Sequence, residues 1–217
     1  MSNKQEVTII DYGLGNLLSL QRAIEKCNMK AIVTSNPNII LDSQRAILPG
    51  VGAFAKGMQE LKIRGLDKVI KNLFLRGTPL LGICLGMQLL FDSSEEFGFT
   101  KGLGIVSGRV IPIPAIDKEG MSLKIPNNGW RSLDIKNNSC WQKSVLKNWS
   151  YAEEEYYFIH SYMVSPNDDS VRVADCIYGG YRVPAFIIKD NLIGFQFHPE
   201  KSGKAGLALL KEFIKYE

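Results

Sequence analysis

The first half of the chain alternates short apolar runs with stretches of helical spacing. The runs are too short for helices and are typical of buried strands: Val7–Ile10, Ala31–Val33, Ala46–Leu48 and Leu80–Ile83. Apolar residues recur at helical spacing in the stretches between or after them: Leu17–Cys27 behind the capping residue Asn16, Leu66–Leu75 and Leu85–Phe91. This alternation predicts an α/β protein with a mostly parallel central sheet and helices on both faces.

The second half has a different pattern. Short strands, turns and aromatic residues fill Gly102–Tyr178, with Pro112 and Pro114 marking Ile111–Met121 as a loop or edge segment. The aromatic residues include Trp130, Trp141, Trp149, Tyr156, Tyr157 and Phe158. Two further strands, Ala185–Ile188 and Leu192–Phe197, and a helix, Ala205–Tyr216, end the chain. We therefore expect a small antiparallel extension of the sheet. Because no linker divides the sequence, we expect one domain over residues 1–217.

Composition and charge argue against several classes of protein. The net charge of +4 is scattered along the chain, whereas proteins that bind nucleic acid usually gather basic residues on one face. No apolar run approaches the ~18 to 20 residues that span a bilayer, and the polar start predicts no signal peptide. The four cysteines form no C-x-x-C pair, and neither they nor the histidines have metal-ligand spacing. The sequence predicts a cytoplasmic protein without a metal, a cofactor, a nucleic-acid partner or a membrane partner.

The sharpest chemical signal is a cysteine between two glycines at the end of an apolar run. Gly82, Cys84 and Gly86 have the spacing of a G-x-S-x-G nucleophile elbow, with cysteine in place of serine. A helix predicted directly after Cys84 would place its N-terminal dipole at the sulfur and favour the thiolate. This pattern predicts a nucleophile and disfavours a serine hydrolase. The alternative is a small buried cysteine in a tight turn.

A thiol nucleophile needs a base, and the chain contains only two histidines. His198 follows an apolar strand and precedes Glu200 by two residues, so the two side chains can share one face of an extended segment. Pro199 between them favours that extended geometry. His160 has no carboxylate at this spacing, so we predict that His198 is the base and Glu200 its orienting acid.

A third signal is the glycine-rich segment Leu48–Phe54, which follows an apolar strand. The glycines in Pro49-Gly50-Val51-Gly52 allow the backbone to present N–H groups to an anion or to change between two conformations. Such donors stabilise the oxyanion of acyl transfer. The alternative is an ordinary glycine-rich turn.

Taken together, these segments resemble class I glutamine amidotransferases, whose nucleophile, base and acid are Cys, His and Glu in that chain order. Within that family they look most like the glutaminase subunits of imidazole glycerol phosphate synthases. The resemblance rests on Asp11–Asn16, Pro49–Gly52, Gly82–Phe91, Phe158–Tyr162 and Gly194–Ser202, which span almost the whole chain. It implies a flavodoxin-like glutamine amidotransferase fold.

The resemblance also implies a role for each matching residue. Cys84, His198 and Glu200 would be catalytic, and the N–H groups of Gly52 and Leu85 would form the oxyanion hole. Glutamine would be held by Gln88, Glu96 and Ser161, and a partner by Asn16, Trp130 and Lys201. The partner would be a cyclase/synthase subunit of β/α-barrel type in a heterodimer. That partner would activate the glutaminase and receive its ammonia for histidine biosynthesis.

One segment departs from the family pattern. The family usually carries Pro-His-Met-Gly-Trp-Asn where it meets the partner, but this chain has Pro126-Asn127-Asn128-Gly129-Trp130-Arg131. Because Asn127, Asn128 and Arg131 differ, the identity of the partner and of the ammonia acceptor stays open. The alternatives are the ammonia-supplying subunit of a sugar-modifying amidotransferase, a stand-alone cysteine hydrolase, and a non-catalytic interaction subunit.

Overall fold

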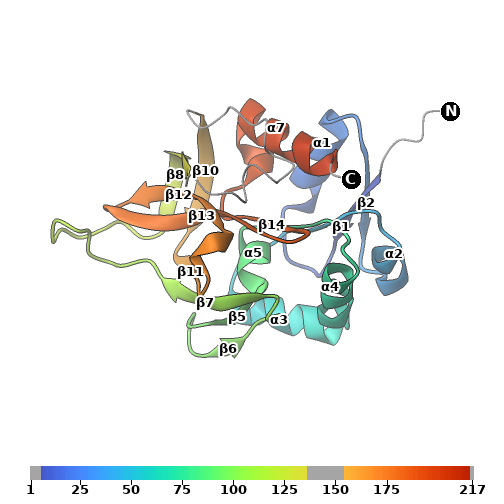
Figure 1. Ribbon diagram of the computed structural model, residues 1–217, viewed down its shortest axis with the longest axis horizontal. Helices are drawn as coiled ribbons and strands as arrows, with labels where there is room; N and C mark the ends of the chain where they lie inside the picture. Colours follow the sequence, from blue (N-terminus) through green and yellow to red (C-terminus); the bar gives the residue numbers. More distant parts are fainter. Residues whose placement is uncertain (1–5, 136–153, 216–217) are drawn as a thin grey trace.

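The computed structural model describes residues 6–135 and 154–215, and an eight-stranded sheet forms its centre (Figure 1). Five neighbouring strands are parallel, in the order β2 (Lys30–Thr34), β1 (Glu6–Ile10), β3 (Ala46–Leu48), β4 (Leu80–Ile83) and β14 (Leu192–Phe195). Three antiparallel strands continue it: β13 (Tyr181–Lys189), β12 (Arg172–Tyr178) and β9 (Asp134–Ile135). The predicted mostly parallel sheet is confirmed.

Helices pack on both faces of this sheet (Figure 1). One face is covered by α1 (Leu17–Lys26) and α7 (Gly203–Ile214), and the other by α2 (Pro37–Leu41), α3 (Phe54–Ile63), α4 (Leu66–Leu75) and α5 (Leu85–Leu89). Neighbouring residues of one strand divide between two buried clusters, as Ile9 and Ile10 do, because their side chains point to opposite faces. The near-continuous apolar strands of the sequence follow from this double coverage.

An antiparallel extension flanks the central sheet. It contains a two-stranded ribbon of β8 (Asn127–Ser132) and β10 (Glu155–His160). A second sheet has the order β11 (Tyr162–Pro166), β7 (Val106–Pro112), β5 (Phe91–Ser94) and β6 (Thr100–Lys101). Only the β5–β7 pair is parallel in these two smaller sheets. The 3₁₀ turns η1 (Asp169–Val171) and η2 (Pro199–Lys201) complete the elements of the described residues.

Several boundaries differ from the sequence prediction. The helix expected over Leu85–Phe91 ends at Leu89, because Phe91 already begins β5. The last helix runs over Gly203–Ile214, while the predicted end at Tyr216 lies outside the described residues, as do Cys140, Trp141 and Trp149. In the segment predicted as a loop or edge segment, Ile111–Met121, β7 extends to Pro112, and an isolated bridge joins Ile116 to Ser122. Helices α2 and α3 were not predicted.

Candidate active site

Cys84 lies at the turn between β4 and α5, where the parallel strands end. Its backbone has φ 53° and ψ −112°, a region that non-glycine residues rarely occupy. A Cβ added at Gly86 would lie 1.8 Å from the backbone oxygen of Leu48, so no larger residue fits there without rearrangement. The glycine of the elbow therefore allows close packing of two segments, and the strained turn holds Cys84 at the pocket.

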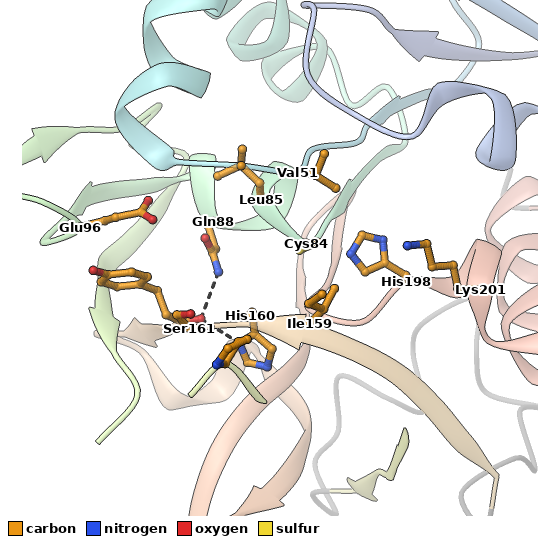
Figure 2. A pocket seen from close by; sticks show the side chains of 13 residues that line it. Val51, Cys84, Leu85, Gln88, Glu96, Ile159, His160, Ser161, His198 and Lys201 are labelled. Carbon is orange, nitrogen blue, oxygen red and sulfur yellow. Dashed lines mark hydrogen bonds between the residues drawn. The ribbon is translucent and has the colours of Figure 1, made fainter. Parts of the chain in front are cut away.

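His198 follows β14, the strand that pairs with β4. Its Nδ1 lies 2.8 Å from Oε1 of Glu200, and both side chains are almost completely buried. Within residues 6–135 and 154–215, the buried Nε2 of His198 has no hydrogen-bond partner. His198 and Cys84 line the same pocket and lie beside each other in Figure 2. The free ring nitrogen is thus the one available to the thiol.

The surroundings of His198 favour its charged form. Burial lowers its pKa, but the neighbouring Cys84 side chain and the hydrogen-bonded Glu200 carboxylate raise it to about 10. From the sequence, Glu200 is expected to lie beside His198 because the two residues are two positions apart. The 2.8 Å distance between their side chains agrees with that expectation.

His160 is held in the opposite protonation state. Its Nδ1 lies 2.8 Å from the Tyr162 carbonyl oxygen, and its Nε2 lies 3.0 Å from Nδ2 of Asn127. Since a carbonyl only accepts, Nδ1 carries the proton and Nε2 accepts from Asn127. Burial lowers the pKa of His160 to about 4. With both nitrogens occupied, His160 is unsuited to act as the base, although it lines the pocket.

Gln196 contacts the cysteine, and sequence reasoning gave it no role. Its Nε2 lies 3.7 Å from Sγ of Cys84, and its Oε1 accepts a 2.9 Å hydrogen bond from Gln88. Gln88 also donates to the Tyr162 carbonyl at 3.1 Å. The signal was present in the sequence, because Gln196 precedes His198 by two residues near the end of the apolar run Leu192–Phe197, and residues two apart in extended backbone share a face.

The segment Pro49–Gly52 lies against the start of α5. Tyr12 donates a 2.9 Å hydrogen bond to the Pro49 carbonyl, and burial followed by the nearby Cys84 charge raises the pKa of this tyrosine. A Cβ added at Gly50 would lie 2.9 Å from the backbone nitrogen of Gly86. Gly52 has φ +111°, which favours glycine, and it lines the pocket together with Leu85. Residues of two segments, the glycine-rich turn and the start of α5, therefore border one cavity.

The pocket has a volume of about 360 Å³, a size suited to a small molecule. It gathers eight of the predicted site residues: Gly52, Cys84, Leu85, Gln88, Glu96, Ser161, His198 and Lys201. Glu96 also accepts a 2.5 Å hydrogen bond from the backbone nitrogen of Phe54, at the start of α3. Glu200, Asn16 and Trp130 do not line it, and the first two border a smaller cavity that His198 also lines.

The residues expected at a partner surface lie mainly on the β8–β10 ribbon. Trp130 is half exposed and packs edge-on against Tyr157, whose ring also lies 5.4 Å from Nζ of Lys201. Asn128 is exposed, whereas Asn127 is completely buried. The interpretation that Asn127 faces a partner is therefore wrong. Its side chain points inward in the alternation of β8 and bonds to His160 instead.

The remaining cysteines, possible metal ligands and possible membrane-spanning helices were considered for the described part of the chain. Cys27 and Cys176 are free and buried, and burial raises the pKa of both thiols. No group of three or more His, Cys, Asp or Glu side chains within residues 6–135 and 154–215 is placed to hold a metal ion. Over the same ranges, no helix has the length and apolarity to cross a membrane.

Comparison with known proteins shows the family of the chain. The model of the family "Glutamine amidotransferase class-I" matches residues 8–216. Imidazole glycerol phosphate synthase subunit HisH of Geobacillus sp. (strain WCH70) is 44% identical over 207 residues, which cover 95% of either chain. The subunit HisH of Geobacter sulfurreducens is 43% identical over 213 residues, 96% of this chain and 97% of that one.

Solved structures show the same fold at low sequence identity. A chain in the structure of PurLQS from Thermotoga maritima matches with a TM-score of 0.72 and 18% identity, over 98% of this chain and 99% of that chain. A crystal structure of a glutamine amidotransferase matches with a TM-score of 0.71 and 15% identity, over 97% of this chain and 99% of that chain. By its family model and its relatives, the chain belongs to the class I glutamine amidotransferases.

Proposed function

We propose that this chain is the glutaminase subunit of an imidazole glycerol phosphate synthase. It hydrolyses glutamine to glutamate and ammonia and works as one domain, residues 1–217, in the cytoplasm. The observation that carries the proposal is the buried His198, which has one nitrogen on Glu200 and the other free beside Cys84. The assignment to this synthase is supported by the relatives that are named as its subunits.

The first half of the reaction forms a thioester. The Cys84 thiolate attacks the side-chain carboxamide carbon of glutamine, and the N–H groups of Gly52 and Leu85 stabilise the oxyanion. His198, held as imidazolium by Glu200, gives its Nε2 proton to the amide nitrogen. The C–N bond then breaks, ammonia leaves, and a glutamyl thioester remains on Cys84.

The second half of the reaction releases glutamate. His198, now neutral, takes a proton from water as that water attacks the thioester carbon. The tetrahedral intermediate expels the Cys84 thiolate and leaves a carboxylic acid, which loses its proton to solvent as glutamate departs. The proton taken from water stays on His198. The enzyme is thus restored to its thiolate–imidazolium state, which agrees with the pKa of about 10 for His198.

The other pocket residues orient glutamine. Glu96 has a carboxylate at the pocket wall and binds the α-ammonium group of the substrate, while Gln88 and Ser161 contact its polar atoms. The glutamine side chain then points toward Cys84. Holding both ends of the substrate converts the attack into an effectively intramolecular step.

Asn16, Trp130 and Lys201 form the surface for a cyclase/synthase partner of β/α-barrel type. In this heterodimer the partner activates hydrolysis and receives ammonia without its release to water. It uses the ammonia to make imidazole glycerol phosphate and the aminoimidazole carboxamide ribotide by-product. A sugar-modifying amidotransferase would use the same hydrolytic site, and the changes at Asn128 and Arg131 leave that acceptor as an alternative.

The test is glutamate release by the chain alone and with the partner that co-purifies with it. We expect little release alone, strong release in the complex, and none above background with Cys84→Ala. Vigorous release by the isolated chain would instead favour a stand-alone cysteine hydrolase. A Cys84→Ala complex as active as the wild type would exclude the proposed chemistry, and co-purification of a sugar-modifying synthase would identify the other acceptor.

A further inference from the structure

Gln196 lies where the central sheet meets the nucleophile. It follows β14 directly, it is completely buried, and its backbone nitrogen is bonded to the Ala185 carbonyl at 2.9 Å. The neighbouring Phe195 carbonyl accepts a 2.7 Å hydrogen bond from the backbone nitrogen of Cys84. The rings of Phe195 and Phe197 on either side are buried and stacked. The backbone around Gln196 is thus tied directly to the nucleophile turn.

The hydrogen bonds fix which end of the Gln196 amide faces the sulfur. The Tyr162 carbonyl can only accept, so the Gln88 atom that contacts it must be the Nε2 donor. That same Nε2 contacts Gln196 at 2.9 Å, which requires Oε1 of Gln196 on that side. Nε2 of Gln196 therefore faces Sγ of Cys84. The Tyr162 carbonyl therefore fixes the orientation of the Gln88 side-chain amide, and Gln88 in turn fixes that of Gln196.

This arrangement gives the sulfur a hydrogen-bond donor that is distinct from His198. An amide N–H stabilises a thiolate, because a hydrogen bond to an ionised acceptor is stronger than one to a neutral acceptor. Unlike imidazolium, an amide does not give up its proton, so it cannot quench the nucleophile. His160 also lines the pocket but is neutral, and it supplies no positive charge.

We propose that Gln196 is a further catalytic residue, which donates its side-chain N–H to the Cys84 thiolate and holds the sulfur at the place of attack. The inference rests on the proposed function, since it concerns the same nucleophile. The Gln88–Gln196 bond serves a second purpose, because it occupies the N–H end of Gln88 and leaves its carbonyl end for the substrate.

Two substitutions of Gln196 distinguish the effect of its N–H donor from the effect of the size of its side chain. Gln196→Met keeps the length and removes both polar atoms, while Gln196→Glu keeps an oxygen for Gln88 and replaces the donor with an acceptor. The readout is the rate of alkylation of Cys84 by iodoacetamide, followed by mass spectrometry on the whole chain without substrate or partner. We expect the rate near neutral pH to fall about ten- to a hundredfold with methionine and further with glutamate.

Asn191 offers a matched control, since its side-chain amide donates a 2.6 Å hydrogen bond to the Thr78 carbonyl away from the pocket. Asn191→Leu removes an amide of the same kind and should leave alkylation within twofold of the wild type. Thermal unfolding of every variant reports on structure. Unchanged alkylation in a folded Gln196→Met variant would overturn the proposal, and so would an equal loss in Asn191→Leu.

Steady-state kinetics of the complex distinguish a catalytic role from an effect on the substrate pocket. Because Gln196 contacts the sulfur, we expect Gln196→Met to lower kcat at least tenfold with KM within threefold. A raised KM with normal kcat and normal alkylation would assign Gln196 to substrate binding through Gln88, against the proposal. If Cys84→Ala retained glutaminase activity, the proposed function would fail while the alkylation comparison still decided whether Gln196 contacts a reactive thiol.

Discussion

The two histidines occupy neighbouring parts of one pocket in opposite states. His198, three residues after β14, lies between the Glu200 carboxylate and Cys84, and these raise its pKa to about 10. His160, at the end of β10, lies between a carbonyl and an amide, and burial lowers its pKa to about 4. Burial opposes the charged form at both sites, so the charge of the partners decides the outcome. Identical side chains in one pocket can therefore serve acid–base chemistry and neutral scaffolding.

The largest expected effect is the difference in kcat between substitutions of His198 and of His160. His198→Gln removes the proton carrier and should lower kcat by about 10⁴-fold or more. His160→Gln is the matched control, because glutamine retains one donor for the Tyr162 carbonyl and one acceptor for Asn127. It should lower kcat less than about tenfold. Glutamate release by the complex measures both, and losses of similar size would break the comparison.

The second effect concerns the carboxylate that distinguishes the two sites. Glu200→Gln removes the charge next to His198, so kcat should fall roughly 10² to 10⁴-fold and the pKa of His198 should drop below about 10. The chain has only two histidines. In a His160→Gln background, one imidazole proton resonance therefore reports on His198 alone. An unchanged titration of that resonance would show that Glu200 does not set the charge.

His198 could be assigned from the sequence because its partner is local. Glu200 is two residues away, and extended backbone brings such side chains to one face. The elbow at Cys84 is also local, and so are strands such as Leu80–Ile83, whose bounds the apolar run gives directly. Features of this kind depend on neighbours in sequence and can be inferred without knowing the fold.

The environment of His160 depends on residues distant in sequence. Asn127 reaches it across the β8–β10 ribbon, a pairing that no local pattern reveals. Gln196 reaches Cys84 across 112 positions, so its spacing from His198 indicated a shared face but not this contact. Helix α3 was missed for a related reason, because Ala53 gives no side-chain cap and the α3 N-terminus is capped from elsewhere by Glu96. Sequence reasoning therefore predicted reacting groups from local spacing and missed contacts that the fold makes between distant segments.

The third effect is on acid stability. A buried His160 with a pKa of about 4 stays neutral while the unfolded chain takes up a proton below its usual pKa of 6.5. Proton uptake by the unfolded chain therefore lowers the free energy of unfolding as the pH falls from 6.5 to 4, by on the order of 3 kcal/mol. His160→Gln should lose this part of the pH dependence. Urea unfolding of both chains at several pH values measures it, and parallel curves would contradict the low pKa.

The smallest effect tests what holds His160 neutral. Asn127→Leu removes the N–H that bonds to Nε2 of His160. Because that bond forms only with neutral imidazole, its loss should raise the pKa of His160 above about 4. The unfolding free energy should fall by about 1 kcal/mol, since the buried ring nitrogen loses its donor. In a His198→Gln background the remaining imidazole resonance gives the pKa, with Asn128→Leu on the exposed face of the same strand as the control. An unmoved titration would mean that burial alone keeps His160 neutral, and the contrast between the two histidines would then rest on Glu200 and Cys84 alone.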